Sequence, residues 1–193
     1  MENAKKSIIT ISGKLGSGKS TTAKRVAAAL GYPHYSGGDF MRMLADKKNL
    51  SMVDFSKLAE TDETIDADID ATQKEFMQAN DNFVIDSRLG WFWEPKSFKV
   101  FLTLDDETAV SRVMDDIEHN PLRKGELSKD HTELLEKLRG RFESERARYK
   151  TYYGIENHFD PAHFDLVIDT KENDVDTVVQ LVLAGFEKWK KTT

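Results

Sequence analysis

Short apolar runs alternate with longer amphipathic stretches along the chain. Five runs, most of them rich in β-branched or aromatic residues, have the length of strands and span residues 7–12, 34–36, 82–86, 98–104 and 164–169. Between them, apolar residues recur every three or four positions, as on the buried face of a helix. Because strands that alternate with helices form a parallel sheet covered on both faces, we predict an α/β fold: a three-layer α/β/α sandwich with a five-stranded, doubly wound parallel sheet.

One connection between strands is much longer than a simple crossover. Residues 36–79 predict helices inserted between the second and third strands. The segment from Ser36 to Asp39 indicates a tight turn and a helix cap, and Ser51 indicates the cap of a further helix.

A long helix is predicted from about His131 to Tyr152. The polar stretch 119–130 before it contains Pro121 and Gly125 and is typical of a mobile excursion. No repeat or low-complexity segment divides the chain, so we predict one domain over residues 1–193. Its parts are a core at 1–35, 80–118 and 160–193, an insert at about 36–79 and an excursion at about 119–130.

A phosphate-binding motif follows the first predicted strand. Residues 13–20 read Gly-Lys-Leu-Gly-Ser-Gly-Lys-Ser and fit the pattern G-x-x-x-x-G-K-[ST] at every fixed position. Glycines let the backbone N–H groups turn toward phosphate oxygens, while Lys19 can reach the β- and γ-phosphates and the Ser20 hydroxyl can bind Mg²⁺. A glycine-rich turn without a ligand would not need the strand before it and the helix after it. The predicted ATP-binding residues here are Gly13, Lys14, Leu15, Gly16, Ser17, Gly18, Lys19, Ser20 and Thr21.

Composition narrows the possible functions. The chain has no cysteine, which excludes disulfides and thiolate metal sites, and its five histidines show no metal-binding spacing. A net charge of −6 argues against a nucleic acid polymer as the main partner. No apolar run approaches membrane-spanning length and residues 1–6 lack the apolar core of a secretory signal, so we expect a cytoplasmic protein with no membrane partner.

The chain resembles the nucleoside monophosphate kinases that carry a P-loop, and most closely the short cytidylate kinase family of archaeal type. The resemblance covers nearly the whole chain and depends on the order and spacing of seven segments. These are GKLGSGKS, YSGGDFMR, DFSKLAE, IDADID, FVIDSRLGW, ESERARYKTYYGI and DLVIDT. It implies transfer of a phosphoryl group from ATP, with Mg²⁺, to a nucleoside monophosphate, CMP or dCMP being the expected acceptor. It also implies that 36–79 binds the acceptor and that 119–130 is a lid.

Asp86 and Arg88 lie at the carboxyl end of the third predicted strand, where open α/β sheets bind ligands. The resemblance implies that Asp86 holds Mg²⁺ through water, together with Ser20, and that Arg88 clamps the acceptor phosphate. The chain departs from the family pattern at Ser87, where glycine is expected. The expected acceptor-binding residues are Ser36, Asp39, Arg42 and Arg88.

Arginines are gathered on the long helix. An apolar stripe runs along it, with Arg141 and Arg148 on one flank and Arg139 and Arg146 on the other. Only one flank is expected to face the cleft, and the resemblance selects Arg141 and Arg148, with Arg146 in reserve. Pairing with Glu143 and Glu145 on a solvated face is the alternative. Arg112, and less clearly Arg123, border the predicted lid. The expected catalytic residues are Lys19, Arg112, Arg141 and Arg148.

Two further segments have an expected or open role. The resemblance places the adenine of ATP at Thr170 and Lys171, after the fifth strand. The run Trp91-Phe92-Trp93 could stack on a base or fill the interior as a hydrophobic plug. We expect a monomer whose partners are ATP and a nucleoside monophosphate. A kinase of another small acceptor and a regulatory ATPase are the alternatives, although the guanine-reading N-K-x-D sequence of GTPases is absent.

Overall fold

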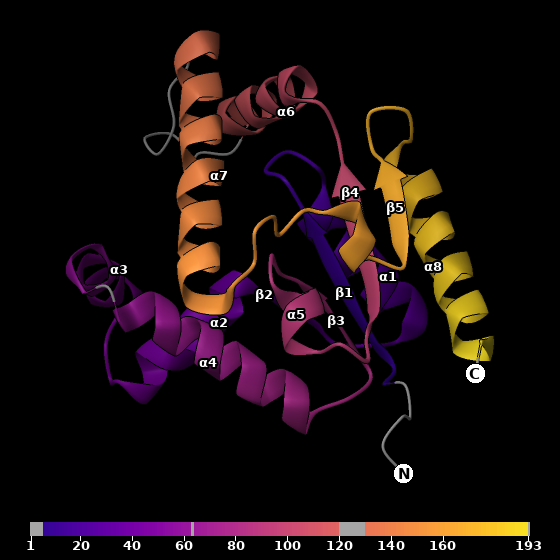
Figure 1. Ribbon diagram of the computed structural model, residues 1–193, viewed down its shortest axis with the longest axis horizontal. Coiled ribbons are helices and arrows are strands. Elements are labelled where there is room, and N and C mark those ends of the chain that lie inside the picture. The colour runs from indigo at the N-terminus through magenta and orange to yellow at the C-terminus, as the bar shows by residue number, and fades with distance from the viewer. Residues whose placement is uncertain (1–5, 63, 120–129, 193) are drawn as a thin grey trace.

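The computed structural model describes residues 6–62, 64–119 and 130–192. Five strands form a single parallel sheet in the order β2-β3-β1-β4-β5 (Figure 1). The strands are β1 (Ile8–Gly13), β2 (His34–Ser36), β3 (Phe83–Asp86), β4 (Phe98–Thr103) and β5 (Leu166–Asp169). The predicted five-stranded parallel sheet is confirmed, and each strand lies within two residues of its predicted bounds.

Helices fill the connections between the strands. They are α1 (Lys19–Leu30), α2 (Gly37–Lys47), α3 (Met52–Thr61), α4 (Thr64–Ala79), α5 (Gly90–Trp93), α6 (Asp106–His119), α7 (His131–Tyr153) and α8 (Val175–Lys191), with the 3₁₀ turn η2 (Pro161–His163). The short α5 and η2 are not predicted from the sequence, because each is too short to show a helical repeat of apolar residues.

Helices α1 and α8 cover one face of the sheet. Ala23 and Val26 of α1 and Val182 and Phe186 of α8 pack on strand residues such as Val100, and all of them are buried. Gly31 ends α1 in the left-handed conformation at φ 67°, which favours glycine after the last turn of a helix.

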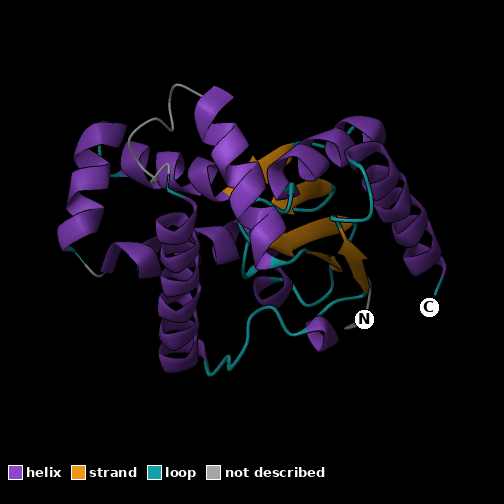
Figure 2. Cartoon of the chain, turned by 90° about the horizontal axis from the view of Figure 1, so that it is seen from above, coloured by secondary structure: helices purple, strands orange, loops and turns teal. Residues whose placement is uncertain are grey.

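The opposite face carries α2, α4, α5 and α7. Phe40 of α2 and Met77 of α4 are fully buried against Ile8 and Ile85 of the sheet, and Tyr149 of α7 joins the same cluster. Seen from above in Figure 2, the orange strands lie between helices on both sides. This is the predicted three-layer arrangement.

The predicted insert consists of α2, α3 and α4. Ser36 caps α2, and the Ser51 hydroxyl accepts a hydrogen bond of 3.1 Å from Asp54 N at the start of α3. The predicted lid falls almost wholly on residues 120–129, and these, with Arg123, lie outside the described residues. Among the described helices, none is long and apolar enough to cross a membrane.

Candidate active site

The loop between β1 and α1 has the backbone that a phosphate-binding loop needs. Gly16 and Gly18 adopt left-handed conformations, at φ 80° and 78°, that favour glycine. A Cβ on Gly13 would lie 2.5 Å from Leu102 O, so glycine is required there for the close approach of β4. The Ser17 side chain is buried and its hydroxyl has no hydrogen-bond partner among the described residues. The strand-loop-helix context that the motif requires is present.

Lys19, the first residue of α1, folds back over this loop. Its Nζ donates a hydrogen bond of 2.8 Å to Lys14 O. Burial of the ammonium group, with the nearby Arg88 guanidinium as the second cause, lowers the pKa of Lys19 to about 7. A cation in so dry and positive a place has a strong electrostatic preference for an anionic ligand.

Ser20 and Asp86, the two residues expected at the metal, are in direct contact. The Ser20 hydroxyl donates a hydrogen bond of 2.6 Å to Asp86 Oδ2. On the other carboxylate oxygen, His34 Nε2 lies 2.6 Å from Asp86 Oδ1. His34 was not predicted as a site residue, because its contact with Asp86 depends on how β2 pairs with β3. In that pairing His34 lies opposite Val84, two residues before Asp86.

Hard oxygen ligands of this kind suit Mg²⁺, which proteins hold through one or two carboxylates together with substrate phosphates. In the described part of the chain, no three His, Cys, Asp or Glu side chains gather as a metal site. Ser20 and Asp86 therefore fit an ion that nucleotide phosphates help to bind, and they do not form an all-protein cage.

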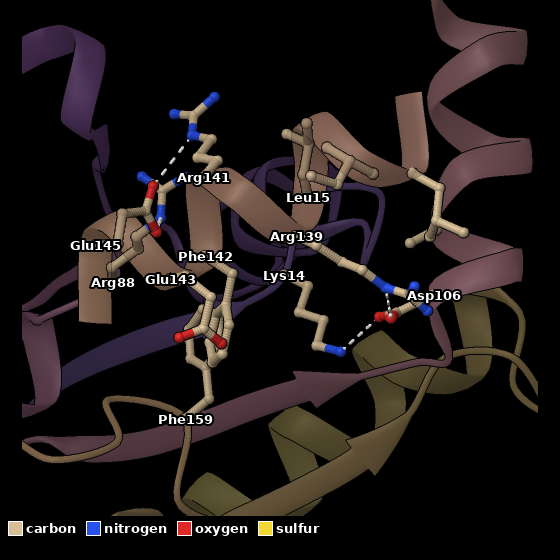
Figure 3. A pocket seen from close by; sticks show the side chains of 13 residues that line it. Lys14, Leu15, Arg88, Asp106, Arg139, Arg141, Phe142, Glu143, Glu145 and Phe159 are labelled. Carbon is tan, nitrogen blue, oxygen red and sulfur yellow. Dashed lines mark hydrogen bonds and ion pairs between the residues drawn. The ribbon is translucent and has the colours of Figure 1, made fainter. Parts of the chain in front are cut away.

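A cavity of ≈ 420 Å³ opens beside the loop, between α6 and α7 (Figure 3). Its lining residues are Lys14, Leu15, Arg88, Asp106, Ala109, Leu135, Leu138, Arg139, Arg141, Phe142, Glu143, Glu145 and Phe159. Two carboxylates in this lining each hold two cations. Asp106 accepts from Lys14 Nζ over 2.8 Å and from Arg139 Nε over 3.2 Å.

Glu145 is the second of these carboxylates. Its Oε2 lies 2.8 Å from Arg88 Nε, and its Oε1 accepts a hydrogen bond of 3.0 Å from Arg141 Nε. The Glu145 side chain is 13% exposed and the Arg141 side chain is 55% exposed, so the carboxylate is mostly buried while its i,i+4 partner Arg141 reaches solvent. Sequence reasoning considered Glu145 only as a surface partner, because the contact with Arg88 depends on how α7 packs against the sheet.

The arginines of α7 are not arranged as the sequence predicts, with one flank of the helix facing the cavity and the other facing solvent. Arg139 and Arg141, from opposite flanks, both line the cavity, and the expectation that only one flank faces it is wrong. Arg148 forms an ion pair with Asp66 of α4, in the insert. Arg146 donates a hydrogen bond of 3.0 Å to Glu156 O, away from the lining residues.

Arg112 and Thr170 lie together at the carboxyl end of β5. Arg112 Nη1 donates to Thr170 Oγ1 over 3.1 Å, and Arg112 Nη2 donates to Thr170 O over 2.5 Å. Arg112 is absent from the cavity lining. The structure therefore places this arginine beside the segment expected to meet adenine.

Three of the expected acceptor residues, at the end of β2 and in α2, form one hydrogen-bonded group. Asp39 Oδ2 accepts from Ser36 N and Ser36 Oγ, over 2.7 and 2.6 Å, and Asp39 Oδ1 accepts from Arg42 Nη2 over 2.6 Å. Ser36 is the register partner of Asp86 in the sheet, so this group begins next to the expected metal site.

Ser87, where the chain departs from the family pattern, joins the insert to the sheet. Its hydroxyl donates a hydrogen bond of 3.0 Å to Gln73 Oε1 of α4, and both side chains are buried. The contact made by Gln73 could not be predicted, because nothing in the sequence distinguishes Gln73 from the other polar residues of a predicted helix.

The Trp91-Phe92-Trp93 run is a hydrophobic plug. Trp91 stacks on His163 with ring centroids 4.0 Å apart, and Trp93 meets Tyr153 edge-on at 4.9 Å. Both tryptophans are buried in the cluster beneath α7 and neither lines the cavity. Of the two open interpretations, the structure favours the plug over a base-stacking wall.

Comparison with known proteins gives a consistent result over most of the chain. The model of the cytidylate kinase-like family matches residues 8–172. A protein of Archaeoglobus fulgidus named cytidylate kinase is 38% identical over 180 residues, which cover 93% of this chain and 94% of the relative. A cytidylate kinase of Natronomonas pharaonis is 38% identical over 177 residues, covering 91% of this chain and 86% of the relative.

Solved structures share the fold at lower identity. An uncharacterized protein from Eubacterium ventriosum superposes with a TM-score of 0.66 at 22% identity, over 96% of this chain and 99% of that chain. Shikimate kinase from Bacteroides thetaiotaomicron superposes with a TM-score of 0.60 at 16% identity, over 93% and 98% of the two chains. At these identities the likeness concerns the fold alone.

Proposed function

The chain belongs to the cytidylate kinase-like family, and we propose that it is a nucleoside monophosphate kinase that transfers the γ-phosphate of ATP to CMP or dCMP. The observation that carries this proposal is the match to the family model over residues 8–172, with full-length relatives named cytidylate kinase. The fold is shared with shikimate kinases, so it does not choose the acceptor by itself. The family match favours a nucleotide over a metabolite hydroxyl and over a regulatory ATPase.

The donor side of the site is the loop after β1. Residues 13–21 surround the ATP phosphates in this proposal, with backbone N–H groups and the start of α1 as the anion-binding elements. Lys19 exchanges its hydrogen bond to Lys14 O for the β- and γ-phosphates. Thr170, at the end of β5, borders the adenine.

The acceptor side lies between the insert and the end of β3. Arg42 and Arg88 bind the phosphate of the monophosphate, and Ser36 and Asp39 border its nucleoside. The position of Arg88 supports this role, because Arg88 lines the cavity together with Lys14 and Leu15 of the loop. The position of Arg42 gives weaker support for phosphate binding, since its side chain is 57% exposed and paired with Asp39.

Mg²⁺ would be held by Ser20 and, through water, by Asp86, and it would neutralise phosphate charge as the phosphoryl group moves. The protein's own contribution is positioning and charge. The acceptor phosphate oxygen attacks the γ-phosphorus in line as the bond to the β-phosphate oxygen breaks, and no covalent enzyme intermediate is needed. Lys19, Arg141 and Arg139 line or border the cavity and stabilise the transferring charge. Arg112 and Arg148 would need to turn from Thr170 and Asp66 to join them.

We also propose that the protein works as a monomer in the cytoplasm, with ATP and a nucleoside monophosphate as partners. The net charge of −6 supports the absence of a nucleic acid polymer among its partners.

A panel of monophosphates tests the proposal. CMP, dCMP, UMP, AMP and GMP are each incubated with ATP and Mg²⁺, and the nucleoside diphosphate formed is measured. We expect CMP and dCMP to react well, UMP more slowly, and AMP and GMP far more slowly, because a site that pairs with cytosine leaves polar groups unpaired with other bases. A preference for AMP or GMP would overturn the acceptor, and ATP loss that no acceptor stimulates would indicate the regulatory ATPase.

A further inference from the structure

We propose that Glu145 is a positioning residue that holds Arg88 and Arg141 in the orientation needed to bind the acceptor phosphate. This inference rests on the proposed kinase function and assigns a role to a residue that neither the phosphate-binding motif nor the expected site contains. A carboxylate in a cavity that receives phosphates would by itself repel them.

The first observation is that Glu145 joins two separate parts of the molecule. Arg88 follows β3 and belongs to the sheet, whereas Arg141 lies one turn before Glu145 on α7. One carboxylate oxygen is 2.8 Å from Arg88 Nε and the other is 3.0 Å from Arg141 Nε (Figure 3). The carboxylate therefore fixes α7 relative to the end of the strand that carries Arg88.

The second observation concerns which nitrogen atoms are used. A guanidinium has five N–H donors, and a phosphate is bound best by two of them at once. Both contacts to Glu145 use the Nε atom. Among the described residues, no group accepts a hydrogen bond from the terminal Nη atoms of Arg88 or Arg141. The carboxylate thus holds each arginine by its stem and leaves the terminal Nη atoms available for phosphate oxygens.

The third observation is the positive charge that surrounds Glu145. Arg88 and Arg141 both lower the pKa of Lys19, whereas Glu145 acts in the opposite direction, so these four groups share one electrostatic environment. Without the carboxylate, the two guanidinium groups and the ammonium would repel one another and turn away. Glu145 is 13% exposed and Arg88 is 28% exposed, so solvent screens their attraction less than that of a surface pair. Arg141 is 55% exposed, and its attraction to Glu145 is the weaker of the two.

The test is the variant Glu145→Gln, which keeps the size of the side chain but removes its charge and one of its two acceptors. Glu136→Gln is the matched control, because Glu136 also lies on α7 but is exposed and does not line the cavity. For both variants, kcat and the KM values of CMP and ATP are measured, CMP binding is measured by calorimetry, and the melting temperature is recorded.

We expect Glu145→Gln to raise the KM and Kd of CMP by about tenfold or more, because Arg88 and Arg141 both lose the charged partner that orients them. The KM of ATP should change less than about twofold, and Glu136→Gln should resemble the wild type. Glu145→Asp keeps the charge on a shorter side chain that cannot reach both arginines, and it should fall between the two. If Glu145→Gln does not fold, the same measurements on Glu145→Asp test the proposal.

Three outcomes separate the possibilities. Tighter CMP binding by Glu145→Gln would overturn the proposal, because the carboxylate would then act only by repulsion. An active wild type with Glu145→Gln equal to Glu136→Gln would overturn this inference and leave the kinase function standing. No acceptor-dependent turnover by the wild type would overturn the proposed function, and this inference with it.

Discussion

The Ser20 hydroxyl donates a hydrogen bond of 2.6 Å to Asp86 Oδ2 and so connects the start of α1 to the end of β3. His34 holds the other oxygen of the same carboxylate. Two side chains, from α1 and from β2, therefore fix one carboxylate at the carboxyl edge of the sheet. Outer contacts of this kind commonly decide how well a metal-binding carboxylate performs.

Replacing Asp86 should change the requirement for Mg²⁺. Asp86→Asn keeps the shape but puts an amide in place of one carboxylate oxygen, so we expect the Mg²⁺ concentration at half-maximal turnover to rise by about 10- to 100-fold. The measurement is a Mg²⁺ titration of turnover, together with calorimetry of ATP binding with and without Mg²⁺. An unchanged Mg²⁺ dependence would remove Asp86 from the metal site.

Removing the Lys19 ammonium should abolish most of the phosphoryl transfer without unfolding the protein. Lys19→Ala leaves the phosphate charge uncompensated in a dry site, and we expect kcat to fall by about 10²- to 10³-fold. Lys24→Ala is the matched control, since Lys24 is exposed on the same helix. Near-normal turnover by Lys19→Ala, at an unchanged melting temperature, would show that this loop is not the donor site.

The acceptor clamp predicts a selective effect on one substrate. Arg42→Lys and Arg88→Lys keep the charge but lose the two-pronged geometry of the guanidinium, so the KM of CMP should rise while the KM of ATP changes little. Arg25→Lys, in the surface ion pair with Asp176, should affect neither constant. If only the ATP constant moved, Arg42 and Arg88 would belong to the donor side.

Buried His158 predicts how stability depends on pH. Burial, followed by the nearby charges of Arg88 and Arg148, lowers the pKa of His158 from 6.5 to about 4. The unfolded chain therefore binds a proton at this residue between pH 6.5 and 4 that the folded chain does not, and stability is lost as the pH falls through this range. From pH 7 to pH 5 we expect a loss on the order of 2 kcal/mol in the free energy of unfolding from this residue.

The measurement is urea unfolding at several pH values for the wild type and His158→Leu. The variant should lose less stability between pH 7 and pH 5, whatever its stability at pH 7. His131→Gln is the control, because His131 is 48% exposed beside Glu107. Parallel pH curves for the wild type and His158→Leu would contradict the prediction.

The sequence predicts those features that are encoded by neighbouring residues. The loop from Gly13 to Ser20 is one continuous motif, and the strands and longer helices follow from short-range apolar periodicity. The caps at Ser36 and Ser51 are equally local. Asp86 and Arg88 can be predicted as site candidates because they lie at the carboxyl end of a parallel strand, where open α/β sheets bind ligands.

What could not be predicted depends on contacts between distant elements. Arg139 turns to the cavity because Asp106 of α6 accepts its hydrogen bond, and helical spacing on α7 holds no information about α6. The same reason hides the contact of Glu145 with Arg88. Arg148 is drawn to the insert by Asp66 in the same way. Ion pairs between distant elements thus decide which arginines reach the site, and these pairs cannot be predicted from a single sequence.

The two outermost strands of the sheet are short. β2 has three residues and β5 has four, so each offers only a few backbone N–H and C=O groups to a strand from another molecule. Such an addition would gain too few hydrogen bonds to offset the entropy of association. Concentrated solutions of this protein should therefore resist amyloid-like growth from the sheet edges, a colloidal property set by strand length rather than by any residue that handles nucleotides.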